Sequence, residues 1–279
     1  MQNRNPPGTA LITGASSGIG EALADRFAGA GFNLVLVARS DDKLRTLATT
    51  LARKHGVKAW AMPADLALEG TAQELATRMT RARRPIDLLV NCAGVLEHGP
   101  FVDMPTQRHR ELITLNVTAL SDMLAVFVPA MVRRGHGRVL NVASIAAFQP
   151  VPMLATYAAS KAYVLSLTES LAEELHGTGV TVTALCPGIT ATAMLDKAQR
   201  SGTGLGKLPA FVVGDVDNVA DEGFDACMAG KVICVPGVLN LATTLAARAA
   251  PRWLVRRVGG TVARRLKPPG ARSRGQDRR

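Results

Sequence analysis

Apolar residues over the first 235 positions recur with two periods, and these periods alternate along the chain. Short runs rich in β-branched residues are separated by longer segments in which apolar residues recur every three or four positions. The short runs predict strands, several of them apolar on both faces, and the longer segments predict amphipathic helices. The predicted strands are Ala10–Thr13, Asn33–Val37, Val57–Ala61, Ile86–Val90, Arg138–Val142, Val180–Leu185 and Lys231–Val235, and the clearest helices are Ile19–Ala30, Asp41–Lys54 and Thr71–Arg83.

This alternation predicts an α/β fold, a doubly wound parallel sheet of about seven strands with helices on both faces. Ligands of such sheets bind in the crevice beyond the carboxyl ends of the strands. The chain has 279 residues, of which 47% are apolar, which is enough for one large domain with a sizeable core. We expect a polar lead over 1–8, the α/β domain over 9–236, a basic amphipathic helical extension over 237–267 and a disordered basic tail over 268–279.

The formal net charge of +11 lies almost entirely at the C-terminal end. From Arg248 onward there are eleven Lys and Arg residues and a single acid, Asp277, which leaves 22 bases and 21 acids in the preceding 247 residues. The basic character therefore belongs to the extension and the tail. It indicates nothing about what the main domain binds.

Cysteine usage and the N-terminus favour a cytoplasmic protein. The four cysteines (Cys92, Cys186, Cys227 and Cys234) form no CxxC pair and no zinc-binding spacing, so we expect reduced, mostly buried thiols and no metal site. The first thirty residues do not resemble an export signal. No run reaches the roughly 18 consecutive apolar residues of a membrane span.

A glycine-rich segment, Thr13–Gly20, separates the first predicted strand from the first predicted helix. Gly14 permits a tight turn, Gly18 permits close approach of the backbone to a phosphate, and Gly20 lets the helix pack against the strand. A pyrophosphate would receive N–H groups at the positive end of the helix. The alternative is a glycine-rich turn with no ligand, because the spacing TGxxxGxG differs from the GxGxxG dinucleotide fingerprint.

Further polar residues follow other predicted strands. Asn91–Gly94 comes directly after one strand and Ser144 after another, and Tyr157 lies thirteen residues beyond Ser144. Lys161 follows Tyr157 by four positions, which places both side chains on one face of a helix.

In this order the motifs resemble those of the short-chain dehydrogenase/reductase family, over roughly Thr9 to Val235. One position departs from the family pattern: Cys92 replaces the second Asn of its NNAG motif. The resemblance implies a Rossmann-type fold and hydride transfer between a nicotinamide cofactor and a carbonyl or alcohol. The matching residues are Thr13–Gly20, Asn91–Gly94, Asn116, Ser144, Tyr157, Lys161 and Pro187–Thr192.

The resemblance implies four catalytic residues, and the chemistry explains their types. Reducing a ketone needs a proton donor within hydrogen-bond reach of its oxygen, which would be Tyr157, with Ser144 polarising the carbonyl. A free phenol titrates near pH ~10, so we expect the positive charge of Lys161 to favour the phenolate. Lys161 would also hold the nicotinamide ribose. Asn116 would anchor a water in a proton relay, or else be a structural amide.

The second predicted strand ends without an acidic residue, which favours NADP(H) over NAD(H). NAD-preferring relatives carry a carboxylate there that accepts from the ribose hydroxyls. Here the strand ends in Ala38, and Arg39 could pair with a 2′-phosphate. Arg39 could instead stack on adenine or face solvent. Asp65 and Leu66 follow the third strand, where the family touches adenine, although Asp65 could equally cap the next helix.

The resemblance gives the remaining cofactor and substrate contacts. The expected cofactor-binding residues are Gly14, Ser16, Ser17, Gly18, Ile19, Gly20, Arg39, Asp65, Leu66, Asn91, Ala93, Gly94, Tyr157, Lys161, Pro187, Gly188, Thr190 and Thr192. Residues 193–206 would form a mobile lid over the substrate. The expected lining of the substrate pocket is mostly apolar and indicates a bulky hydrophobic ketone: Leu96, His98, Val151, Met153 and Met194. His98 could serve as a second proton donor, but a loop histidine is the simpler interpretation.

The segment 238–266 reads as two basic amphipathic helices broken at Pro251, with Leu241, Leu245 and Trp253 on one side. Packing on the core or on a neighbouring subunit is the first interpretation of these helices. Contact with an anionic membrane surface is the second. Nucleic-acid binding is not expected, because only Trp253 could offer a stacking platform.

These residues together favour an NADP(H)-dependent oxidoreductase that interconverts a hydrophobic ketone or aldehyde and its alcohol. It would be cytoplasmic, with possible peripheral membrane association, and by resemblance a homodimer or homotetramer. The alternatives are a non-catalytic dinucleotide-binding sensor and a membrane-surface adaptor that acts through its basic tail. A sugar-nucleotide epimerase is disfavoured because the glycine spacing differs and no second substrate domain follows.

Overall fold

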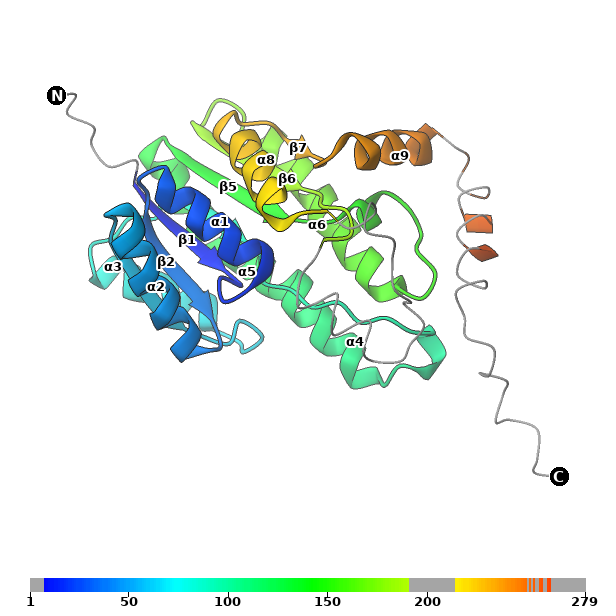
Figure 1. The fold of residues 1–279 in the computed structure, drawn as a ribbon, viewed down its shortest axis with the longest axis horizontal. Helices are drawn as coiled ribbons and strands as arrows, with labels where there is room; N and C mark the ends of the chain where they lie inside the picture. Colours follow the sequence, from blue (N-terminus) through cyan, green and yellow to red (C-terminus); the bar gives the residue numbers. More distant parts are fainter. Residues whose placement is uncertain are drawn as a thin grey trace.

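A seven-stranded parallel sheet forms the centre of the protein (Figure 1). A computed structural model describes residues 8–190 and 214–249, together with 251, 253, 256, 257, 260 and 261. The strand order is β3-β2-β1-β4-β5-β6-β7, so the chain reverses its direction of winding between β3 and β4. The strands are β1 (Thr9–Thr13), β2 (Asn33–Ala38), β3 (Ala59–Pro63), β4 (Leu88–Asn91), β5 (Gly137–Val142), β6 (Val180–Leu185) and β7 (Ile233–Cys234). The predicted α/β fold and its sheet are confirmed.

Helices cover both faces of this sheet. They are α1 (Gly18–Gly29), α2 (Asp41–His55), α3 (Thr71–Arg81), α4 (Thr106–Ile113), α5 (Ala119–Arg134), α6 (Ala155–Glu174), α8 (Val216–Met228) and α9 (Val238–Ala249). Three shorter segments are η1 (Phe101–Asp103), the π-turn η2 (Thr114–Thr118) and η3 (Ile145–Phe148). One apolar core joins the sheet to α1, α2 and α8, and a second joins it to α3, α5 and α6.

Alternation along the strands produces these two cores. Leu11 and Val35 face the core of α3, α5 and α6, while Ile12 and Leu36 face the core of α1, α2 and α8. All four side chains are fully buried. Because a central strand buries both faces, it needs apolar residues at successive positions, which is the continuous apolar pattern seen in the sequence.

The third strand lies two positions later than predicted. The sequence pattern placed it at Val57–Ala61, whereas the observed pairing with β2 begins at Leu34 opposite Ala59. Helix α2 continues to His55, and Gly56 ends it in the left-handed conformation with φ +70°. The next two residues are needed to connect the helix to the sheet. The strands predicted from Ile86 and Lys231 also begin two residues later, at Leu88 and Ile233.

A long helical stretch, Thr106–Arg134, comprises α4, η2 and α5. By length and composition it could cross a membrane. However, its α5 portion buries Met123, Phe127 and Met131 in the core beside the sheet. This burial identifies α5 as an internal helix of the domain.

Buried polar side chains join two central strands to α6. The Asn91 amide donates to Oδ1 of Asn141 at 2.9 Å, and the Asn141 amide donates to Oγ1 of Thr168 at 3.0 Å. Thr168 in turn donates to the carbonyl of Val164, one turn earlier in the helix, at 2.7 Å. The chain of hydrogen bonds fixes the position of α6 against β4 and β5.

We expect Thr168→Val to destabilise the fold. The shape of the side chain is retained, but the Asn141 N–H group loses its acceptor inside the core, which costs about 1–3 kcal/mol. Urea unfolding measures the change. Ser170→Ala is the matched control: it removes an exposed hydroxyl that bonds within the same helix and should cost less than ~0.5 kcal/mol. Equal losses for the two variants would contradict the role of the buried chain.

Candidate functional site

A cavity of about 530 Å³ opens at the carboxyl ends of six strands. Its walls come from the segments that follow β1 to β6, the crevice in which this type of sheet binds ligands. Seventeen of the predicted site residues line it: Gly14, Ser16, Ser17, Gly18, Ile19, Gly20, Arg39, Asp65, Leu66, Ala93, Gly94, Ser144, Tyr157, Lys161, Pro187, Gly188 and Thr190. Asn91 and Asn116 lie behind the wall, and Thr192 lies outside the described residues.

The glycine-rich segment forms a tight cradle between β1 and α1. Gly14 has φ +68°, and a Cβ atom there would lie 2.9 Å from Cα of Ala93. A Cβ atom at Gly20 would collide with the carbonyl of Gly14. The Ser17 side chain makes no capping bond to α1, which leaves the N–H groups of the first turn beside the cavity. These features fit the diphosphate of a dinucleotide.

Thr13 holds the segment that faces this cradle. Its hydroxyl accepts the N–H groups of Cys92 and Ala93 at 3.0 and 3.1 Å and donates to the carbonyl of Val90 at 3.2 Å. Asn91 lies in β4 with its amide bonded to Asn141, and its Oδ1 is buried with no hydrogen-bond partner in the described structure. The Asn91 side chain therefore supports the strand beneath the cradle.

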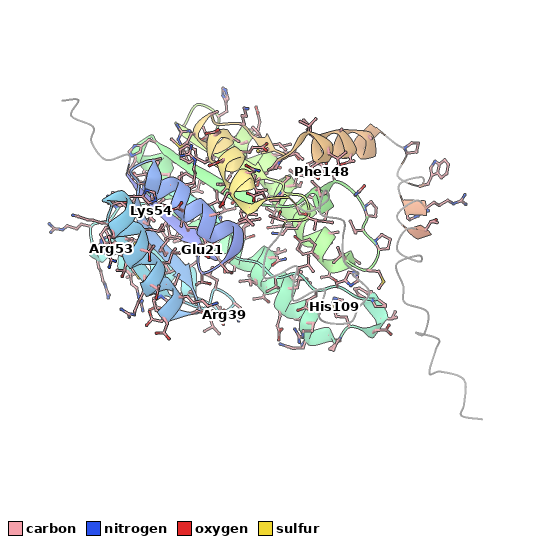
Figure 2. All side chains as sticks on the ribbon, in the orientation of Figure 1. Glu21, Arg39, Arg53, Lys54, His109 and Phe148 are labelled. Atoms are coloured by element: carbon pink, nitrogen blue, oxygen red, sulfur yellow. The ribbon has the colours of Figure 1, made fainter. Side chains whose placement is uncertain are left out.

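Arg39 and Ser40 line the opposite end of the cavity and are exposed (Figure 2). β2 ends at Ala38, and neither of the next two residues is acidic. Within the described part of the chain Arg39 makes no hydrogen bond or ion pair, so its guanidinium is available to an anion.

Asp65 lies on the cavity wall and does not cap a helix. Its Oδ1 accepts the N–H of Ala67 at 3.0 Å, which forms a local turn. Helix α3 begins at Thr71, after Gly70 as its N-cap. The alternative that Asp65 caps the next helix is therefore wrong.

Tyr157 and Lys161 project from the first turns of α6 into the cavity. Lys161 is only 6% exposed, and its Nζ donates to the carbonyl of Val142, at the end of β5, at 2.7 Å. Nζ lies 5.8 Å from the centroid of the Tyr157 ring. Ser144 follows β5 and accepts the N–H of Ala146 at 3.1 Å. Strand β5 and helix α6 thus bring the predicted Ser, Tyr and Lys to one wall.

The pKa of Tyr157 differs from the sequence expectation. We expected Lys161 to lower it, whereas burial of the phenol raises the pKa of Tyr157 above its usual value. A hydrogen bond with Ser144 acts in the opposite direction but does not outweigh burial. The physical reason is desolvation, which disfavours the phenolate, while the Lys161 ammonium is directed at a backbone carbonyl. The phenol is thereby kept protonated at neutral pH.

Burial also lowers the pKa of Lys161, to about 8. Desolvation disfavours the ammonium form, and the hydrogen bond to Val142 supplies only part of the lost hydration. All four cysteines are free, and burial raises the pKa of each thiol, to about 11 for Cys92. The thiol of Cys92 is therefore neutral where it lines the cavity.

Asn116 lies in the π-turn η2 and is buried. Its Oδ1 accepts the N–H of Val95 at 2.8 Å, and its amide donates to the Val95 carbonyl at 2.9 Å and to Oγ of Ser160 at 3.1 Å. Asn116 therefore ties the segment after β4 to α6. These bonds fit the interpretation that the Asn116 amide has a structural role. A role of Asn116 in a proton relay stays a prediction.

The substrate end of the cavity is mostly apolar. Leu96 and Val151 line it as expected, His98 and Met153 do not, and Met194 lies outside the described residues, as does the predicted lid. Several wall residues are not predicted from the sequence: Leu115, Ile145, Gln149, Leu154 and Ile189. Gln149 is half-buried, and its amide has no hydrogen-bond partner among the described residues. Its position five residues after Ser144 was the only signal.

A further residue without a predicted role, His109 of α4, contacts the first turn of α6 (Figure 2). Its Nδ1 lies 2.7 Å from the hydroxyl of Thr156, next to Tyr157. Its ring packs on Phe101 with centroids 4.4 Å apart. These contacts join α4 and η1 to the start of the helix that carries Tyr157.

Comparison with known proteins agrees with this geometry. The family model for short chain dehydrogenase matches residues 8–202. A short chain dehydrogenase of Pseudocercospora fijiensis is 37% identical over 182 residues, which cover 64% of this chain and 59% of that protein. The chain thus spans less than two thirds of that relative's length.

Solved structures match over nearly the whole chain. A short-chain dehydrogenase from Sphingobium yanoikuyae in complex with NADPH is 33% identical with a TM-score of 0.76, and the match covers 95% of this chain and 98% of that one. A bulky-bulky ketone specific alcohol dehydrogenase from Comamonas testosteroni is 30% identical with a TM-score of 0.74, covering 98% and 100%. A Burkholderia phymatum short chain dehydrogenase/reductase in complex with NAD is 28% identical with a TM-score of 0.76, covering 85% and 92%.

Three observations therefore agree: the family model matches the sequence, the sheet has the strand order described above, and Ser144, Tyr157 and Lys161 lie on one wall of the cavity. This chain belongs to the short-chain dehydrogenase/reductase family of oxidoreductases, which act on CH–OH groups.

Proposed function

We propose that this protein is an NADP(H)-preferring oxidoreductase that interconverts a bulky hydrophobic ketone or aldehyde and its alcohol. The observation that carries the proposal is the composition of the cavity at the carboxyl ends of the strands, which has Ser144, Tyr157 and Lys161 beside apolar residues on one wall and Arg39 at its far end. The cavity volume of about 530 Å³ lies within the range of small-molecule and cofactor sites in proteins.

Tyr157 transfers the proton in this reaction. Its hydroxyl donates to the oxygen of a carbonyl substrate during reduction and accepts that proton back during oxidation. The raised pKa of Tyr157 suits the acid role, because the phenol stays protonated through the neutral range. The Ser144 hydroxyl orients the substrate oxygen and stabilises the charge that develops on it. When bound, the nicotinamide supplies or accepts the hydride at the substrate carbon.

The lining of the cavity supports a hydrophobic substrate. The side chains of Leu96, Val151 and Leu154 offer no hydrogen bonds, and Gln149 beside them is a polar side chain without a partner among the described residues. Such walls bind bulky apolar groups, while one amide orients a polar substituent. The Comamonas testosteroni enzyme, described as specific for bulky-bulky ketones, supports the same substrate class.

Arg39 supports the cofactor preference. Arg39 is exposed, has no partner among the described residues and follows a strand that does not end in a carboxylate, so its guanidinium can pair with a 2′-phosphate through charge-assisted hydrogen bonds. The structure from Sphingobium yanoikuyae contains NADPH, whereas the one from Burkholderia phymatum contains NAD. The bound cofactor therefore differs between these two relatives, and we assign the preference of this chain to Arg39.

Tyr157→Phe should reduce ketone turnover by about 10²–10⁴-fold, because the hydroxyl that donates the proton to the substrate oxygen is lost. NADPH oxidation with a series of diaryl ketones measures turnover, and NADPH fluorescence measures binding, which should stay nearly unchanged. Tyr163→Phe is the control: Tyr163 lies on the same helix and bonds Ser121 at 2.9 Å outside the cavity. If Tyr157→Phe keeps more than a few per cent of the activity, Tyr157 is not the proton donor.

Arg39→Ala should weaken NADPH binding by about 10–100-fold, the value of one or two charge-assisted bonds, and leave NADH binding within about twofold. Parallel fluorescence titrations with both cofactors measure the change. Arg53→Ala removes an equally exposed arginine from α2 and should affect neither titration. A wild-type preference for NADH would refute the cofactor proposal and leave the fold and the proton chemistry intact.

Lys161→Met should abolish activity yet stabilise the cofactor-free fold at pH 7, by about 1–3 kcal/mol. The pKa of Lys161 falls from 10.5 to about 8 on folding, so below pH 8 the folded state holds a charge that water would solvate better. Between pH 8 and 10.5 the unfolded state binds more protons, so wild-type stability rises with pH in that window.

The stability advantage of Lys161→Met should therefore shrink as pH increases from about 8 to 10.5. Urea unfolding of both proteins at pH 7 and pH 10 tests this sign. A variant that is less stable than wild type at both values would mean that the bond to Val142 outweighs the cost of burying the charge.

A further inference from the structure

Helix α9 is turned so that the apolar residues whose side chains are described face outward. Val238 and Leu239 are 86% and 62% exposed, and Leu241, Ala242 and Ala246 are also exposed. Thr244, by contrast, is 6% exposed and Asn240 is half-buried. An ordinary surface helix buries its apolar stripe. We call the exposed set Val238, Leu239, Leu241, Ala242 and Ala246 the outer face of α9.

Polar contacts hold α9 in this orientation. The Asn240 amide donates to the carbonyl of Pro236 at 2.8 Å, and a Cβ atom at Gly188 would lie 2.6 Å from that amide. The N–H of Gly237, just before the helix, donates to the Glu222 carboxylate at 3.2 Å. Helix α9 packs against η3, with Phe148 beneath it in Figure 2. The polar side of α9 is therefore the side that docks on the domain, beside a wall residue of the cavity.

A strongly basic segment follows α9 directly. From Arg248 to the C-terminus the sequence carries eleven bases and one acid. Arg256 and Arg257 are exposed, and the Arg257 guanidinium lies 5.8 Å from the centroid of the exposed Trp253 ring. An apolar helix face, an exposed tryptophan and clustered arginines are the components of an interfacial membrane-binding segment.

We propose that the outer face of α9, together with Trp253, Arg256 and Arg257, binds an anionic lipid surface. The net charge of +10 in the sequence from Arg248 onward favours such a surface. Apolar side chains enter the boundary between headgroups and acyl chains, and the arginines attract acidic headgroups. A second copy of the chain is a poorer occupant, because pairing would bring two segments of net charge +10 together. Nucleic acid is also poorer, because the outer face of α9 carries no cationic side chain.

The experiment measures co-sedimentation of the full-length protein with vesicles. One set contains phosphatidylcholine alone and the other includes about one third phosphatidylglycerol, each at low and high salt. We expect binding to the anionic set only, weakened by salt, since charge attraction to the headgroups is screened.

Two pairs of variants separate the apolar and the charged contributions. Leu239→Glu should lower binding about tenfold, because it removes one leucine side chain that would be buried in the lipid. Leu68→Glu introduces the same change at a residue of matched exposure, 66%, far from α9, and should have no effect. Arg256→Gln with Arg257→Gln should also lower binding. The control pair, Arg53→Gln with Arg81→Gln, removes two exposed arginines from α2 and α3 and should leave vesicle binding unchanged, because these helices are not part of the proposed surface.

Three results would overturn the proposal. They are absence of binding to anionic vesicles, equal binding to both vesicle sets, and equal effects of Leu239→Glu and Leu68→Glu. Sedimentation velocity without lipid tests the competing occupant: dissociation of an oligomer by Leu239→Glu alone would assign the outer face to a second copy. NADPH binding by every variant, measured in solution, verifies that the domain remains folded. These outcomes are independent of the substrate proposed above.

Discussion

The buried ammonium of Lys161 is the interaction on which the site depends. A charge that is 6% exposed at the edge of an apolar sheet needs a partner, and it has the carbonyl of Val142 at 2.7 Å. That bond joins α6 to the end of β5, the same strand that leads into Ser144. Moving either element by one residue would separate the lysine from its acceptor, so the bond fixes the register of the catalytic wall.

Supports on two sides keep that wall in place. From below, the amides of Asn91 and Asn141 connect two strands to Thr168 in the middle of α6. From the side, Asn116 ties α6 to the segment after β4 through Ser160. None of these side chains needs to touch substrate to matter, because each restricts where α6 can lie. The stability of the fold and the precision of the site thus share the same hydrogen bonds.

Local chemistry made most of this arrangement predictable. The strands and the glycine cradle follow from periodicity and from positions such as Gly14 that require φ > 0, and four-residue spacing places Tyr157 and Lys161 on one helix face. What failed depended on tertiary surroundings. The pKa of Tyr157 is decided by how much of the phenol is buried, which spacing does not reveal. The wall position of Gln149 results from the path of the chain after Ser144. The outward orientation of the apolar residues of α9 depends on the packing of Asn240 against Gly188, which lies 52 residues earlier in the sequence.

The two ends of the cavity use positive charge in opposite ways. Arg39 is exposed to water, so its charge carries little desolvation cost, and in the proposed function it selects the cofactor. Lys161 is buried, its pKa is lowered to about 8, and its charge opposes folding at neutral pH. Such a cost persists only where the charge acts on chemistry in a dry environment, in which electrostatic interactions are strong. The difference in solvation supports the roles proposed for the two ends, cofactor selection at Arg39 and reaction at Lys161.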